Sequence, residues 1–101
     1  MGTFTRVADT ADLKPGEGTV VEVAGKTLAL FNVDGTFYAL DNTCLHRGGP
    51  LGEGELEGAV VTCPWHGWRW DVTSGANTNN PAVKVACFPV KVEGSSVLVA
   101  I

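Results

Sequence analysis

The chain has 101 residues, of which 45% are hydrophobic and 18% charged, and its formal net charge is −4. This composition is typical of a folded globular protein, and the length predicts one domain over residues 1–101. The seven Lys and Arg are scattered, which argues against nucleic acid as a partner, and no apolar run approaches the roughly 18 residues of a membrane-spanning helix. The first residues lack the pattern of a secretory signal, so we expect a cytoplasmic protein.

Short runs rich in β-branched and apolar residues alternate with turns along the chain. The predicted strands are residues 19–23, 27–33, 36–40, 59–62, 68–72, 90–93 and 96–100. Turns are indicated at 24–26, at Asp34-Gly35, which is a strong hairpin signal, and at Gly94-Ser95. No segment keeps a helical period over eleven residues, so helix content should be very low. The pattern predicts an all-β fold, either an antiparallel β-sandwich or a small barrel.

Two short motifs each combine a cysteine with a histidine. The first is Cys44-Leu45-His46, and the second, after sixteen intervening residues, is Cys63-Pro64-Trp65-His66. A single cysteine is usually a small buried hydrophobe, and a single histidine is usually structural. Two such pairs in Gly- and Pro-rich loops instead predict a metal centre held by Cys44, His46, Cys63 and His66. The third cysteine, Cys87, has no histidine nearby, and we expect it to fill space in the core.

The order of the four candidate ligands is Cys, His, Cys, His. Common zinc modules place Cys beside Cys and His beside His, although a mononuclear zinc site could still accept these four ligands. If each motif gives one ligand to each iron of a two-iron cluster, two Cys hold one iron and two His hold the other, which is Rieske ligation. A zinc-binding structural module therefore stays open, and visible colour would distinguish it from an iron–sulfur protein.

The segments 44–51 and 63–68 resemble the two cluster-binding motifs of Rieske proteins, including the gap between them. From Phe4 to Ile101 the chain resembles the Rieske ferredoxins of bacterial ring-hydroxylating dioxygenases. The resemblance implies one [2Fe-2S] cluster per chain, bound by a subdomain of two loops. It also implies a soluble one-electron carrier between a flavoprotein reductase and a terminal aromatic-ring oxygenase. The alternative within this fold is the Rieske-like small subunit of an NAD(P)H nitrite reductase.

The resemblance also bears on catalysis and potential. Rieske oxygenases need a second iron held by two His and a carboxylate, and both histidines here are already assigned, so we expect no enzyme activity in this chain. High-potential Rieske proteins carry an additional Cys in each motif, and this chain has Gly49 and Trp65 at those positions. They also carry hydroxyl groups that donate hydrogen bonds to cluster sulfurs, and this chain has Trp68 and Trp70 at those positions. The reduction potential should therefore lie at the low end of the Rieske range. Trp68 and Trp70 should pack beneath the cluster loops or in the core.

Two groups of residues could form the surface near the motifs. The densest charge cluster is Glu53, Glu55 and Glu57, which we expect to be a solvated loop rather than a docking patch. The apolar residues within the motifs, which could form a landing surface for a partner protein, are Leu45, Pro64 and Trp65.

Overall fold

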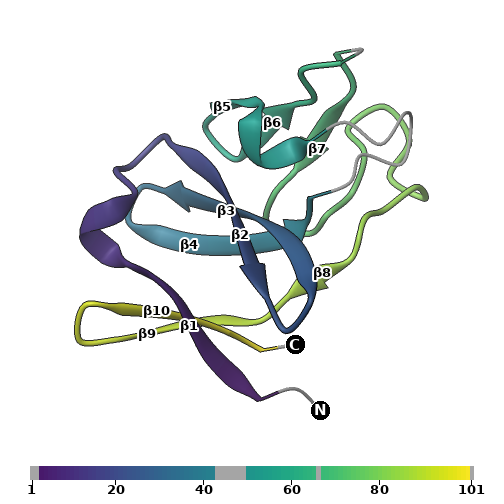
Figure 1. The fold of residues 1–101 in the computed structure, drawn as a ribbon. Helices are drawn as coiled ribbons and strands as arrows, with labels where there is room; N and C mark the ends of the chain where they lie inside the picture. Colours follow the sequence, from purple (N-terminus) through teal and green to yellow (C-terminus); the bar gives the residue numbers. More distant parts are fainter. Residues whose placement is uncertain (1–2, 43–49, 66, 101) are drawn as a thin grey trace.

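The computed structural model describes residues 3–42, 50–65 and 67–100, in which ten strands form three antiparallel sheets (Figure 1). The first sheet has the order β1 (Phe4–Asp9), β10 (Ser96–Ala100), β9 (Val90–Glu93). The second has the order β2 (Gly18–Val23), β3 (Lys26–Val33), β4 (Thr36–Asp41), β8 (Cys87–Phe88). The third has the order β5 (Glu55–Glu57), β6 (Val60–Thr62), β7 (Arg69–Asp71). The expected all-β antiparallel fold is confirmed, and the sheets of the described residues do not close into a barrel.

The predicted hairpins of the second sheet form where the turn residues indicate. Ala24 and Gly25 join β2 to β3 with φ angles of 51° and 79°, and Asp34 and Gly35 join β3 to β4 with φ angles of 51° and 92°. Positive φ at both central residues is the requirement of a two-residue type I′ turn, which Gly meets without strain. The twist of such a turn matches that of the strands, so the three long strands pair in a single register.

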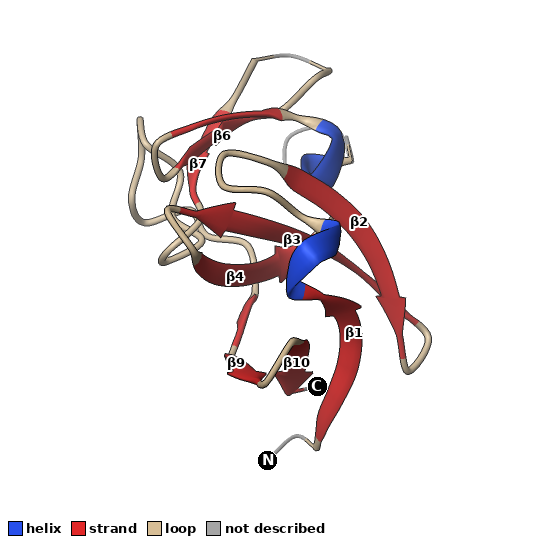
Figure 2. Cartoon of the chain, turned by 90° about the vertical axis from the view of Figure 1, so that its left-hand side faces the viewer, coloured by secondary structure: helices blue, strands red, loops and turns tan. Residues whose placement is uncertain are grey.

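Strand β3 is the centre of the molecule because both of its faces are buried. Ala29 and Phe31 belong to one core, which lies between the second sheet and the third. Leu28 and Leu30 belong to another core, which includes Val97 and other residues of the first sheet. Figure 2 accordingly shows β3 and β4 between β6 and β7 on one side and β9 and β10 on the other. The sheets therefore form layers, and the third sheet covers one face of β3.

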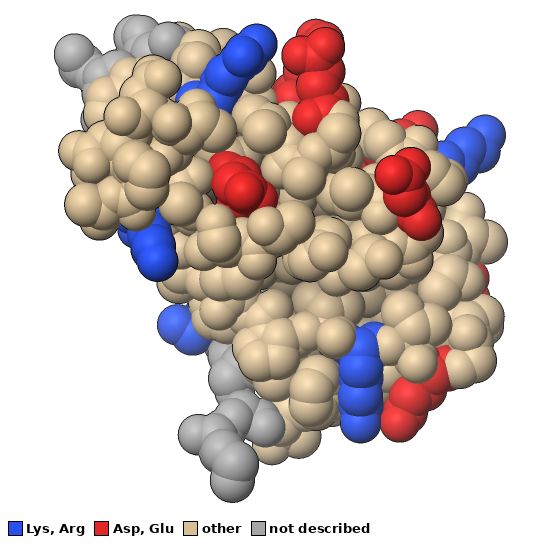
Figure 3. All heavy atoms as spheres, turned by 180° about the vertical axis from the view of Figure 1, so that it is seen from behind, with Lys and Arg blue, Asp and Glu red and all other residues tan. Residues whose placement is uncertain are grey.

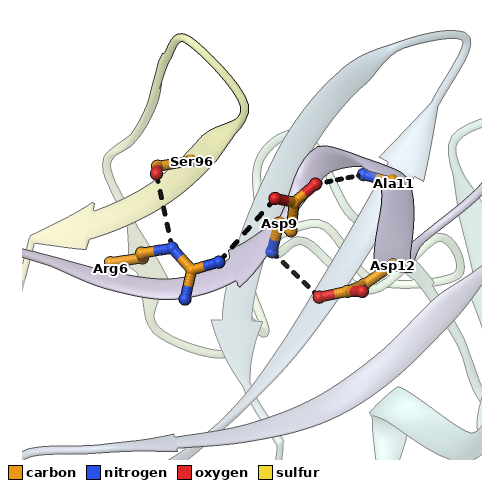
Figure 4. Close-up of polar contacts among 5 residues, drawn as sticks. All are labelled: Arg6, Asp9, Ala11, Asp12 and Ser96. Atoms are coloured by element: carbon orange, nitrogen blue, oxygen red, sulfur yellow. Dashed lines mark hydrogen bonds and ion pairs between the residues drawn. The ribbon is translucent and has the colours of Figure 1, made fainter.

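A small polar network fixes the end of β1 against β10 (Figure 4). Asp9 caps the 3₁₀ helix η1 (Thr10–Asp12), accepting a hydrogen bond from the Ala11 N–H (2.9 Å), while its own N–H donates to Asp12 Oδ2 (3.0 Å). Arg6 lies 3.8 Å from the Asp9 carboxylate and donates to Ser96 Oγ at 3.3 Å. The Asp9 and Asp12 carboxylates thus accept from backbone N–H groups at the start of the short helix, while Arg6 joins Asp9 to Ser96 through side chains.

Several strands were not predicted from the sequence. The expectation of a loop at Glu55 and Glu57 was wrong, because both residues lie on β5 with half-buried Leu56 between them. Both glutamates are nevertheless exposed, as the prediction required. Strand β1 and the two-residue strand β8 were also missed, since each is short or lacks a clear apolar alternation.

No helix in the part of the chain described here has the length and apolar character needed to cross a membrane.

The close approach of β5 and β6 generates the first prediction. A Cβ on Gly54 would overlap the carbonyl oxygen of Thr62 and lie 2.9 Å from Val61 Cγ2. We therefore expect Gly54→Ala to destabilise the protein by about 1–3 kcal/mol, because a backbone oxygen cannot move aside as a side chain can. Such a loss lowers the melting temperature by roughly 4–8 °C per kcal/mol in a domain of this size.

The matched control is Glu55→Ala, which removes an exposed side chain from the next residue and should change stability by less than about 0.5 kcal/mol. Thermal unfolding followed by circular dichroism measures both variants. Equal melting temperatures for the two variants would contradict this account of the third sheet.

Candidate metal centre

The β6–β7 hairpin holds the second cysteine–histidine motif. Residues Thr62 and Arg69 are paired across the two strands, and the Cys63 N–H donates to the Trp68 carbonyl at 2.7 Å. The Gly67 N–H then donates to the Cys63 carbonyl at 3.1 Å, with Gly67 at a φ of 77°. Pro64 has no N–H to continue the ladder, so strand pairing ends at this point. The local sequence thus closes a tight loop at the end of the third sheet.

Cys63 points inward from this loop. It is 2% exposed and belongs to the same core as Leu51, Val61 and Trp70. A charged thiolate is costly to bury in such apolar surroundings, and binding to a metal ion provides the compensating charge. The position therefore suits a thiolate that serves as a metal ligand.

The other three predicted ligands, Cys44, His46 and His66, lie outside the described residues, so the four-residue ligand set stays a prediction. The residues on either side of the first motif are described. The Leu51 N–H donates to the Asn42 carbonyl at 2.7 Å, and the Gly52 N–H donates to Asn42 Oδ1 at 2.8 Å. Leu51 is fully buried in the core that contains Cys63. Asn42 and Leu51, which flank the first motif, are therefore held together, and Leu51 packs in the same core as Cys63.

Cys87 does not lie in the core, so that expectation was wrong. It is exposed on β8, a short strand at the edge of the second sheet, where it pairs with Leu40. The pKa of Cys87 is raised above its ordinary value, mainly by the partial burial of its thiol and to a smaller extent by the nearby Asp71 carboxylate. A raised pKa disfavours the thiolate that a metal would require. Across the described residues, no group of three or more Cys, His, Asp or Glu side chains could hold a metal ion.

The two tryptophans of β7 and its preceding loop pack as predicted. Trp70 is fully buried and Trp68 half-buried, and their ring centroids lie 6.1 Å apart with the planes tilted by 38°. The indole Nε1 of Trp70 is buried and has no hydrogen-bond partner among the described residues. Trp70 lacks a hydroxyl, but its indole N–H is also a hydrogen-bond donor, which the comparison of hydroxyl groups alone does not reveal.

An acidic hollow adjoins the loop of the second motif. It has a volume of about 510 Å³ and is lined by Glu53, Glu55, Glu57, Thr62, Cys63, Pro64, Gly67 and Arg69. Arg69 lies 3.9 Å from Glu57, an exposed ion pair that contributes little to stability. Pro64, which lines the hollow, is exposed, and the next residue, Trp65, is 56% exposed. We call these two residues the apolar tip, and the carboxylates of the hollow lie next to it. Leu45, the third residue predicted for this surface, lies outside the described residues.

The described residues fit an iron–sulfur cluster in their chemistry. Cys63 offers a buried sulfur ligand, and the buried N–H of Trp70 is a donor without an acceptor in the same core. Sulfur atoms of a cluster accept such hydrogen bonds, and these bonds tune its potential.

The chain is similar in sequence to proteins that form one family. Residues 3–89 match the Rieske [2Fe-2S] domain. The ferredoxin component of the naphthalene 1,2-dioxygenase/salicylate 5-hydroxylase systems of Ralstonia sp is 39% identical over 88 residues, covering 86% of this chain and 85% of the relative. The biphenyl dioxygenase ferredoxin subunit of Pseudomonas sp. (strain KKS102) is 35% identical over 99 residues, covering 96% and 91%.

Solved structures agree with these sequence relatives. The ferredoxin of carbazole 1,9a-dioxygenase from Nocardioides aromaticivorans IC177 has a TM-score of 0.90 and 36% identity, covering 97% of each chain. A ferredoxin solved in a complex of reduced oxygenase and oxidized ferredoxin in carbazole 1,9a-dioxygenase has a TM-score of 0.89 and 34% identity, covering 99% of this chain and 94% of that one.

The difference between Cys63 and Cys87 gives the second prediction. Cys63→Ala should reduce bound iron and acid-labile sulfide to background, because it removes a predicted ligand that is buried. Cys87→Ala should retain the native content of both, because Cys87 is exposed and its pKa is raised. Iron and sulfide assays per chain measure both variants, with melting temperature as a check on folding. An equal loss of iron in the two variants would refute this assignment.

Proposed function

Because the chain belongs to the Rieske [2Fe-2S] family, we propose that residues 1–101 form one Rieske domain that carries single electrons to the terminal oxygenase of an aromatic-ring dioxygenase system. The observation that carries this proposal is the agreement along nearly the whole chain with dioxygenase ferredoxins, at 97% of each chain for the carbazole example. A ferredoxin 34% identical to this chain occurs in a complex with its oxygenase, which supports an oxygenase as the electron acceptor.

A Rieske domain holds a [2Fe-2S] cluster, which when bound supplies reversible one-electron transfer at roughly −150 to +300 mV. We propose that Cys44 and Cys63 hold one iron and that His46 and His66 hold the other. The buried, inward-pointing sulfur of Cys63 supports its place in this set. The family match favours this cluster over the zinc-binding module that the order of ligands had left open.

The chain itself transfers electrons and catalyses no reaction on a substrate. Its relatives are named as ferredoxin components or subunits of dioxygenase systems. The alternative of a nitrite reductase small subunit finds no support among these relatives, and we set it aside.

The source of the electrons is proposed to be a flavoprotein reductase, since a carrier that loads an oxygenase must itself be reduced by another protein. We also propose a cytoplasmic location. A reducing compartment keeps cysteines available as thiolate ligands, which is what the proposed cluster requires.

The surface around Cys63 suits brief contact with a partner. The apolar tip of Pro64 and Trp65 offers contact area close to a predicted ligand. The three glutamates of the acidic hollow would attract a basic partner at long range, an effect that salt screens. On the face that Figure 3 shows, acidic and basic side chains are dispersed rather than gathered by sign. We therefore assign close contact to the tip and electrostatic attraction to the acidic hollow.

The proposed function is tested by mixing the reduced protein with the oxidised oxygenase component of a naphthalene dioxygenase system in a stopped-flow instrument. The expected result is loss of the reduced absorbance of this protein together with reduction of the oxygenase. Failure to transfer electrons, with the cluster intact, to this oxygenase and to biphenyl and carbazole counterparts would refute the proposal.

Variants of the tip and the hollow give the third prediction. Trp65→Ala should slow electron transfer about tenfold at high salt, because a central aromatic contact is worth 1–2 kcal/mol or more in an interface. The control, Val92→Ala, removes an exposed apolar residue, 46% accessible, from β9 in the first sheet, and should leave the rate unchanged.

Replacing Glu53, Glu55 and Glu57 together by Gln should slow transfer at low ionic strength and have little effect at high ionic strength. The rate constants are measured in the same stopped-flow experiment across a salt series. A slower rate in the Val92 variant combined with a native rate in the Trp65 variant would place the contact surface elsewhere.

A further inference from the structure

The indole N–H of Trp70 is the buried side-chain polar group that has no partner within the described residues. Trp70 is 0% exposed, so water at the surface does not satisfy this N–H. A buried donor without an acceptor costs about 1–3 kcal/mol, and such groups are rare in folded proteins. Its retention in the core therefore indicates an acceptor beyond those that the described residues supply.

The surroundings of Trp70 restrict what that acceptor is. Among the buried side chains of its core, the sulfur of Cys63 is the one potential acceptor, and all others are hydrocarbon. Asn77 lies opposite Trp70 in an isolated bridge, but its Oδ1 already accepts from the N–H groups of Asn79 (2.9 Å) and Asn80 (3.0 Å). An acceptor for the indole is therefore expected on the side of Cys63.

The register of the β6–β7 hairpin places Trp70 and Cys63 on one face. Val61 is paired with Trp70, and Cys63 follows Val61 by two residues, so all three side chains leave the hairpin on the same side. Diagonal neighbours on such a face are about 7–8 Å apart, within reach of a long aromatic side chain. The buried donor thus shares the inner face of the hairpin with the predicted cluster ligand.

We propose that the Trp70 N–H donates a hydrogen bond to a sulfur of the [2Fe-2S] cluster, either a sulfide or a thiolate ligand, and thereby raises its reduction potential. This inference rests on the cluster site proposed above. On reduction the cluster gains one electron and one negative charge, while Trp70 keeps its proton. A hydrogen bond to a more negative acceptor is stronger, so it stabilises the reduced form more than the oxidised form. Trp70 is thus a positioning and tuning residue, because it lacks a hydroxyl but supplies an indole N–H donor at position 70.

The test is Trp70→Phe, which keeps an aromatic ring and removes the N–H. At a solution potential equal to the native midpoint, we expect the ratio of reduced to oxidised protein to fall about three- to tenfold. This corresponds to a midpoint lowered by about 30–60 mV for a one-electron couple. The control is Val92→Ala, which changes an exposed residue of β9 in the first sheet, and its midpoint should stay native. Protein-film voltammetry measures the midpoints.

A second measurement uses the native sequence and does not depend on the variant holding its cluster. Protein with ¹⁵N at the indole nitrogens is reduced and studied by pulsed electron paramagnetic resonance. We expect a coupling from one indole nitrogen to the unpaired spin. This coupling should remain in Trp65→Phe, which removes the exposed indole.

The outcomes separate this inference from the proposed function. A native protein without iron and sulfide would refute the cluster site itself. A fully loaded Trp70→Phe protein with a native midpoint, or a loaded native protein without indole coupling, would overturn the role of Trp70 alone.

Discussion

The burial of β3 on both faces is the constraint on which the rest of the structure depends. Its side chains point alternately to opposite sides, so Ala29 and Phe31 need cover on one face while Leu28 and Leu30 need it on the other. The third sheet covers Ala29 and Phe31, and the first sheet covers Leu28 and Leu30. The third sheet also ends in the loop that carries Cys63, so the element that completes the core is the element that presents the candidate ligand.

The sequence predicts the long hairpins because their turns demand residues that tolerate positive φ, such as Gly35. It also predicts Cys63 as a candidate ligand, because the spacing of the motifs is local information. It does not predict β5, because a three-residue segment with two glutamates has no clear strand pattern. This segment becomes a strand through its pairing with β6. The sequence also does not predict the exposure of Cys87. Apolar neighbours in the sequence do not indicate whether a strand lies at the edge of a sheet, as β8 does.

The surface near Cys63 reflects two opposing needs of an electron carrier. A partner must approach quickly and closely, which the acidic hollow and the apolar tip promote through charge and contact. It must also leave after each transfer, which favours a small interface of less than about 1,200 Å². Beneath this surface the core is apolar, so few buried polar groups can respond to the charge change on reduction. The buried indole N–H of Trp70 is one of them.

The central claim is that this chain holds a two-iron cluster with histidine ligands and exchanges one electron. It is tested most directly by reductive titration of protein labelled with ¹⁵N-histidine, followed by pulsed electron paramagnetic resonance of the reduced form. The account predicts one electron per two irons and coupling of the unpaired spin to nitrogens of both histidines in the chain. Zinc in place of iron, or a reducible cluster without histidine coupling, would contradict it.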